Sequence, residues 1–165
     1  MIFQLLPDEF ASMVAFIGIL FAFLTTIIAT DKLCAFLPKD AGREFAHAGK
    51  KSAGKPRGAG IIFVLAFVLA TLLFMPVQAE NIIYLILIVI CMMTGFLDDA
   101  SKTPWGEYKK GFLDLCVAAM VALTFLKFNS NVVTLALFGI SFTLPRVVFA
   151  LLTIVLVWVS VNVTN

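Results

Sequence analysis

The sequence predicts an all-α polytopic membrane protein with about five transmembrane helices, on three observations. The chain of 165 residues is 62% hydrophobic with a mean hydropathy of +1.07, whereas soluble domains are about half apolar. Its charged residues are bunched, which leaves uncharged runs at residues 10–30, 58–79, 81–97 and 147–165. Runs of this length are typical of membrane-spanning helices, because only a helix satisfies its own backbone hydrogen bonds in lipid.

The five spans can be placed along the chain from these runs. We expect them at residues 10–30, 58–75, 81–97, 111–126 and 147–161. The first follows Asp8 and Glu9 with no basic residue before it, so it is not typical of a cleaved signal peptide. Between the last two spans, β-branched residues around Gly139 predict a short hairpin at the outer surface.

The distribution of Lys and Arg predicts the orientation. Ten of the twelve basic residues lie in two loops on one side of the expected membrane: Lys32, Lys39, Arg43, Lys50, Lys51, Lys55, Arg57, Lys102, Lys109 and Lys110. Only Lys127 and Arg146 lie on the other side. The positive-inside rule then places the basic loops and the C-terminus in the cytoplasm and the N-terminus outside a plasma membrane. The lipid bilayer is the expected partner, and no nucleic acid is.

Two cytoplasmic motifs combine polar residues that could do chemistry. In GKPRGAG, residues 54–60, glycines allow unusual dihedrals, and Lys55 and Arg57 can bind phosphate oxygens before a helix N-terminus. The alternative is a loop of membrane-surface lysines. In GFLDDASK, residues 95–102, Asp98 and Asp99 form a candidate magnesium or general-base site. The alternative is a helix-end salt bridge with Lys102, which shares a face with Asp98 if the helix continues.

Two further stretches carry candidate ligand-binding groups. Lys109 and Lys110 precede the fourth span, either as clamps for a diphosphate or as interface anchors. Asn162 and Asn165 are three positions apart after the fifth span, which places them on one helix face.

In this order the motifs resemble the polyprenyl-phosphate N-acetylhexosamine-1-phosphate transferases, most of all the phospho-N-acetylmuramoyl-pentapeptide transferases of peptidoglycan synthesis. The resemblance implies transfer of a sugar-1-phosphate from a UDP-sugar to undecaprenyl phosphate, with Mg²⁺ and release of UMP. It implies that Asp98 and Asp99 are catalytic and lie near the metal. Lys102 and Lys110 match lysines near the phosphates, and Asn162 and Asn165 match asparagines before the family's D-G-x-D-G segment.

The chain also departs from the family pattern. GKPRGAG stands where these transferases usually show G-T-P-T-M-G-G, so UDP-N-acetylmuramoyl-pentapeptide and UDP-N-acetylglucosamine both stay open as substrates. No D-G-x-D-G segment is present. We therefore expect residues 1–165 to form a single transmembrane domain, the N-terminal half of a larger transferase, inactive by itself. A homodimer is left open.

Three other functions would use parts of the same sequence. In an ion-coupled carrier, Asp98 and Asp99 would be the intramembrane ionisable pair, but both are expected at the interface. A prenyl-diphosphate enzyme would use D-D-x-x-D, and DDASK fails at its last position. An inactive membrane fragment stays open.

Overall fold

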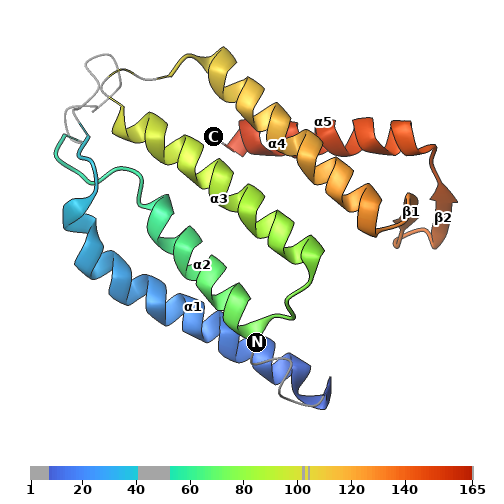
Figure 1. The fold of residues 1–165 in the computed structure, drawn as a ribbon, viewed down its shortest axis with the longest axis horizontal. Helices are drawn as coiled ribbons and strands as arrows, with labels where there is room; N and C mark the ends of the chain where they lie inside the picture. Colours follow the sequence, from blue (N-terminus) through green and yellow to red (C-terminus); the bar gives the residue numbers. More distant parts are fainter. Residues whose placement is uncertain (1–7, 41–52, 102, 104, 165) are drawn as a thin grey trace. The chain divides into compact units, whose positions relative to one another are not determined.

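A computed structural model describes residues 8–40, 53–101, 103 and 105–164 of the protein. Its elements in chain order are α1 (Ala11–Leu33), α2 (Gly60–Phe74), α3 (Ala79–Ala100), α4 (Glu107–Phe128), β1 (Val132–Leu135), β2 (Ile140–Thr143) and α5 (Arg146–Thr164) (Figure 1). Short 3-10 turns at Asp8–Phe10 and Cys34–Phe36 flank α1. The protein is an all-α polytopic membrane protein with one small hairpin, as its sequence predicts.

Four of the described helices, α1, α3, α4 and α5, are long and apolar enough to cross a membrane. Few of their residues are buried in the protein, and none of the apolar window of α5 is. Such apolar exposure is costly in water and is expected in lipid. The fifth, α2, has 15 residues. At 1.5 Å per residue it is about 22 Å long, which is shorter than the hydrocarbon core of about 30 Å.

The observed helix ends differ from several expected boundaries. α3 continues to Ala100, so Asp98 and Asp99 lie in its last turn and not in the following loop. α4 begins at Glu107, four residues before the expected start, so Lys110 lies in its first turn. The fourth span, α4, is therefore longer than the sequence predicts, and the second, α2, is shorter.

The described residues divide into two compact units. The first comprises α1, α2 and the end of α3 from Met92 onward, and the second comprises α3 up to Cys91, α4, the hairpin and α5.

In the first unit, small residues bring α1 and α2 together. A Cβ atom added at Gly18 of α1 would lie 2.9 Å from the Cβ atom of Phe74 on α2. The rings of Phe21 and Phe74 are 5.4 Å apart between centroids, and Ala66 and Ala70 of α2 are buried. Small residues at a helix contact let the two backbones approach closely, which is the usual source of packing energy between helices in lipid.

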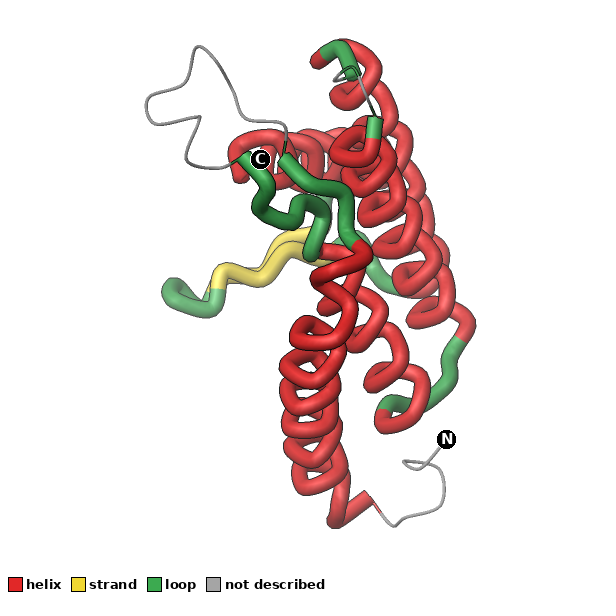
Figure 2. The backbone as a smooth tube through the Cα atoms, turned by 90° about the vertical axis from the view of Figure 1, so that its left-hand side faces the viewer, coloured by secondary structure: helices red, strands yellow, loops and turns green. Residues whose placement is uncertain are grey.

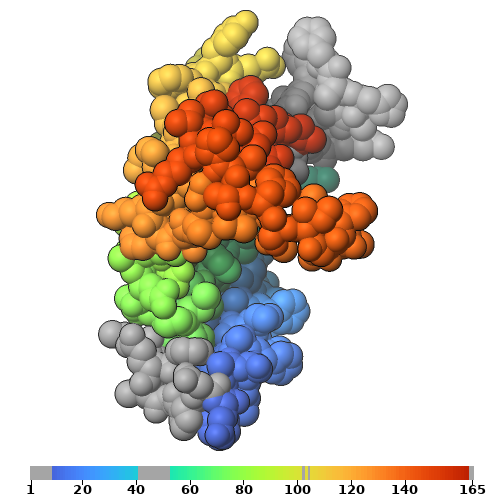
Figure 3. Space-filling view, turned by 90° about the vertical axis from the view of Figure 1, so that its right-hand side faces the viewer, coloured from blue at the N-terminus to red at the C-terminus, as the bar shows by residue number. Residues whose placement is uncertain are grey.

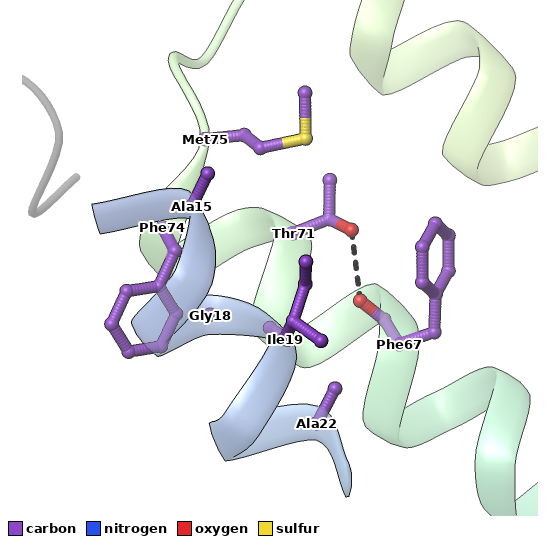
Figure 4. Close-up of a pocket in the computed structure, with 9 residues that line it drawn as sticks. Ala15, Gly18, Ile19, Ala22, Phe67, Thr71, Phe74 and Met75 are labelled. Carbon is purple, nitrogen blue, oxygen red and sulfur yellow. Dashed lines mark hydrogen bonds between the residues drawn. The ribbon is translucent and has the colours of Figure 1, made fainter. Parts of the chain in front are cut away.

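An apolar cavity of about 380 Å³ lies beside this contact (Figure 4). Gly18, Ile19 and Phe74 are among the residues that line it. The Thr71 hydroxyl, its polar side-chain group, donates to the Phe67 carbonyl oxygen at 2.9 Å within the same helix. The lining is otherwise apolar and contains no charged residue, so the cavity does not suit a nucleotide.

In the second unit, α4 packs on α5. Ala118 and Ala122, one turn apart on α4, are fully buried, and the rings of Phe125 and Phe149 stack with centroids 5.5 Å apart. At the other end of the pair, the indole N–H of Trp158 donates to the Gly111 carbonyl oxygen at 2.8 Å. The α4–α5 pair is thus fixed at both ends.

The hairpin expected between the last two spans is present, and its two strands, yellow in Figure 2, are antiparallel. Val132 pairs with Thr143 and Leu135 with Ile140. Gly139 in the connecting turn has φ of 63°, which residues with a side chain rarely adopt. The base of the hairpin is closed by the Asn131 side chain, which donates to the Leu144 carbonyl oxygen.

Candidate functional site

The first unit joins the GKPRGAG loop to the GFLDD motif through an ion pair. The Arg57 guanidinium donates from Nη2 to Asp99 Oδ1 at 2.7 Å. Both side chains are about one-third exposed, at 33% and 32%. The residues are 42 positions apart in the chain, so the folded backbone and not local sequence makes the contact.

Electrostatics explains why a cation is needed at this place. Asp98 and Asp99 are adjacent like charges in the last turn of α3, where the helix dipole also disfavours negative charge. That last turn contains no basic residue of its own. Arg57 therefore supplies, from another segment, the positive charge that α3 lacks.

Backbone pairing between two loop segments positions Arg57. The Arg57 N–H donates to the Pro38 carbonyl oxygen at 2.7 Å, and the Asp40 N–H donates to the Lys55 carbonyl oxygen at 2.8 Å. These bonds surround an antiparallel bridge between Lys39 and Pro56. The segment after α1 thus aligns the GKPRGAG loop and aims the guanidinium at α3.

Gly58 lets the loop approach α3 closely. Its φ is 69°, and an added Cβ atom would lie 2.9 Å from Phe96 Cδ2 and 3.8 Å from Asp99 Oδ2. Gly54 of the same motif also has positive φ, at 83°. The unusual dihedrals expected for this motif are present, and sequence reasoning missed that Gly58 is also the contact point with Phe96 and Asp99.

The end of α3 separates the side-chain directions of Asp98 and Asp99. Adjacent helical residues point in different directions, about 100° apart, so the two carboxylates do not share a face. The helix stops after Ala100, because Ser101 is extended, with ψ of 143°, and its hydroxyl lies 2.7 Å from the Asp98 carbonyl oxygen. The expected helical pairing of Asp98 with Lys102 is therefore not set up by a continuing helix. Lys102 itself lies outside the described residues.

The remaining expected ligand-binding residues belong to the second unit. Lys110 lies in the first turn of α4, immediately before Gly111, which accepts the Trp158 bond. Asn162 is one turn beyond Trp158 on α5, and its amide donates to the Trp158 carbonyl oxygen at 2.9 Å. The Trp158–Gly111 bond thus brings Lys110 and Asn162 to the same end of the α4–α5 pair. Asn165 lies outside the described residues.

Lys109 is held by an aromatic contact in that same unit. Its ammonium lies 3.4 Å from the centroid of the Trp105 ring, a cation–π geometry. The contact favours Lys109 as an anchor of the α4 start.

The donor set fits a magnesium ion only in part. Mg²⁺ is usually held by one or two carboxylates together with waters and substrate phosphates. Within the described ranges, no three or more His, Cys, Asp and Glu side chains gather in a group that could hold a metal ion. Asp98 and Asp99 supply oxygens of the right kind, and Asp99 Oδ1 already accepts from Arg57. This set suits a metal that takes its other ligands from a substrate, and does not suit a closed structural site.

Comparisons with known proteins agree with the motifs. A family model described as glycosyl transferase family 4 matches residues 81–165. A phospho-N-acetylmuramoyl-pentapeptide-transferase of Treponema pallidum subsp. pallidum is 41% identical over 134 residues, which is 79% of this chain and 37% of that relative. A protein of the same description from the Nichols strain of Treponema pallidum matches equally well. The chain thus spans 37% of the length of these relatives. No solved structure matches significantly.

Proposed function

Because the chain belongs to glycosyl transferase family 4, we propose that it is part of an enzyme that transfers a phospho-sugar from a UDP-sugar to undecaprenyl phosphate in peptidoglycan synthesis. The favoured sugar nucleotide is UDP-N-acetylmuramoyl-pentapeptide. The relatives that match 79% of the chain carry that activity in their names, which supports the choice.

The ion pair between Arg57 and Asp99 is the observation that carries the proposal. It joins the GKPRGAG loop to the GFLDD motif where α3 ends. A lipid phosphate and a water-soluble nucleotide can meet only at a membrane surface, which is where a spanning helix ends. Both substrates are anionic, so two aspartates there would repel them unless cations offset the charge.

The reaction requires little covalent chemistry from the protein. A phosphate oxygen of the lipid forms a bond to the sugar-linked phosphorus, and the bond from that phosphorus to UMP breaks. Positioning and charge neutralisation supply most of the catalysis in such transfers. In this proposal Asp98 and Asp99 are the catalytic carboxylates, which take a proton from the attacking phosphate when it is protonated and would hold Mg²⁺ beside it.

In this proposal, basic and amide side chains of the motifs bind the phosphates. We assign this role to Lys55, Arg57, Lys102, Lys110, Asn162 and Asn165. Mg²⁺, with Asp98 and Asp99 as its protein ligands, would neutralise the charge that develops on the phosphates. Lysines on flexible stems act as point charges for a diphosphate, and Arg57 can share its five donors between Asp99 and a phosphate.

We further propose that residues 1–165 form one transmembrane domain that corresponds to the N-terminal half of a larger transferase in the plasma membrane, with its active face in the cytoplasm. The match to only 37% of the relatives' length supports a larger transferase. The concentration of basic residues in the loops beside the motifs supports a cytoplasmic active face.

UDP-N-acetylglucosamine is the alternative sugar nucleotide. Arg57 resembles the branch of the family that uses this nucleotide, whereas Lys102 resembles the muramoyl branch. An inactive membrane fragment and an ion-coupled carrier are the competing functions of other classes.

The test is release of UMP in vesicles that contain undecaprenyl phosphate and Mg²⁺. The 165-residue chain is compared with a version extended to the length of its relatives, each with both UDP-sugars. Release by the extended version alone supports the proposal, and the preferred nucleotide identifies the substrate. Release by neither version with either nucleotide contradicts it, and proton or ion uptake by the same vesicles would then support the carrier.

A further inference from the structure

We propose that the β1–β2 hairpin lies flat on the membrane surface, with one face on the acyl chains and the other in water. This inference concerns a membrane-binding surface and does not depend on the proposed enzymatic function.

The two faces of the hairpin differ in chemistry. Side chains alternate between the faces of a strand, and residues directly opposite each other share a face. The register therefore groups Val133, Leu135, Ile140 and Phe142 on one face. The other face carries Val132, Thr134, Ser141 and Thr143. On this second face the hydroxyls of Thr134 and Ser141 lie 3.0 Å apart and hydrogen-bond to each other.

The apolar face is not covered by the described parts of the protein. Leu135, Ile140 and Phe142 are 43%, 53% and 42% exposed, and the strands pack only against each other among the described elements. The turn adds Leu137 and Phe138, which are 96% and 73% exposed. In Figure 3 the hairpin is the orange lobe that projects beside the helices of its unit. A two-stranded hairpin is only marginally stable alone in water, so this face needs a partner.

The chain holds the hairpin at the membrane boundary from both sides. Three residues separate the end of α4 at Phe128 from β1, and two separate β2 from the start of α5 at Arg146. At no more than about 3.6 Å per residue, the strands begin within about 15 Å of the helix ends. Lys127 and Arg146 mark that level, because basic side chains at helix ends reach the headgroups. No charged residue lies between these two.

Backbone hydrogen bonding then fixes the depth. Both strands are edge strands, so each carries N–H and C=O groups without a strand partner. Such edges do not occur in the hydrocarbon region, but water and headgroups satisfy them at the interface. The flat orientation puts these edges at the headgroup level and the apolar face on the acyl chains. The occupant of this face is therefore lipid, which is continuous with the surface already exposed along α4 and α5.

The experiment measures the surroundings of single spin labels on the full 165-residue chain in lipid nanodiscs. Cys34, Cys91 and Cys116 are first replaced by Ala. Two neighbouring pairs of cysteine variants are then compared, Leu135→Cys with Thr134→Cys on β1, and Ile140→Cys with Ser141→Cys on β2. In each pair the second variant is the matched control on the hydroxyl face. Accessibility is measured to oxygen, which concentrates among acyl chains, and to a nickel chelate, which stays in water.

We expect labels at positions 135 and 140 to be several-fold more accessible to oxygen than to the chelate, and the reverse at 134 and 141. Chelate access to all four positions would overturn the proposal by placing the hairpin in water. Exclusion of both reagents at 135 and 140 would overturn it in favour of a protein partner, and spin–spin broadening would identify that partner as a second copy. Equal ratios of oxygen to chelate accessibility within both pairs of neighbouring labels would also contradict the proposal.

Discussion

Arg57 Nη2 and Asp99 Oδ1 lie 2.7 Å apart although 42 positions of sequence separate the two residues. The contact explains how two adjacent aspartates are accommodated in the last turn of α3. Arg57, from the loop before α2, offsets the negative charge of Asp99. Both the neighbouring Asp98 carboxylate and the dipole of α3 disfavour that negative charge.

Asp99→Asn should abolish transfer in the extended enzyme while the protein still inserts into the membrane. The amide keeps the size of the side chain but removes its negative charge and its ability to accept a proton. A positioned acid–base group contributes about 100-fold or more to a rate, so UMP release should fall by at least that factor. Glu9→Gln, an exposed carboxylate change at the start of the chain, is the control. Full activity of the Asp99 variant would remove it from the mechanism.

Arg57→Met and Asp99→Asn should show coupled effects on stability. The ion pair is one-third exposed, so its net contribution should be in the range of about 0.2–1 kcal/mol. The double variant should therefore be less destabilised than the sum of the two single variants. Thermal unfolding in detergent micelles measures the cycle. Strict additivity would show that the pair contributes nothing to the folded state.

Gly58→Ala should destabilise the protein more than Gly54→Ala. Both positions have positive φ, which costs about 1 kcal/mol or more for a residue with a side chain. Only Gly58 also meets Phe96, at 2.9 Å from an added Cβ atom, whereas the Cβ of Gly54 would meet nothing within 4 Å. Gly106→Ala, with φ of −62° and open space, is a control with neither feature. Equal melting temperatures for the Gly58→Ala and Gly106→Ala variants would contradict the close approach of Gly58 to Phe96.

Gly18→Ala and Gly95→Ala should have opposite signs, although both glycines lie within helices. Alanine favours a helix over glycine by about 1 kcal/mol. At Gly95 the added methyl meets nothing within 4 Å, so the substitution should stabilise the protein. At Gly18 the methyl would meet the Phe74 Cβ atom at 2.9 Å and push α1 from α2. The test is the unfolding midpoint, which should lie above that of the parent protein for Gly95→Ala and below it for Gly18→Ala. Phe74→Ala should partly restore the stability of the Gly18→Ala variant.

Trp158→Phe should loosen the end of the α4–α5 pair that carries Lys110 and Asn162. The variant keeps an aromatic ring and loses the N–H that donates to the Gly111 carbonyl oxygen, a bond worth about 0.5–1.5 kcal/mol. Hydrogen exchange at the start of α4 should become faster. Trp105→Phe is the matched control, since the ring that Lys109 contacts remains. Unchanged exchange in the Trp158 variant would show that the bond does not hold the two helices together.

The helices and the hairpin could be predicted from sequence because each depends on local properties. Long uncharged runs must be helical in lipid, and the β-branched residues around Gly139 predict a turn between strands. The helix ends were less predictable. A helix can continue past the apolar run into charged residues at the interface. The hydrophobic pattern therefore ends α3 before Asp99 and begins α4 after Lys110, whereas both residues lie within these helices.

The sequence alone determined which residue types gather at the candidate site: aspartates after one span, and basic residues in the adjoining loops. Only the tertiary structure decided that Arg57 pairs with Asp99, that Gly58 contacts Phe96, and that Trp158 joins the end of α5 to the start of α4. The physical reason is the distance along the chain over which each interaction acts. Hydropathy and helix periodicity act over neighbouring residues, whereas these contacts join segments dozens of positions apart, and no local pattern specifies which partner each side chain will meet.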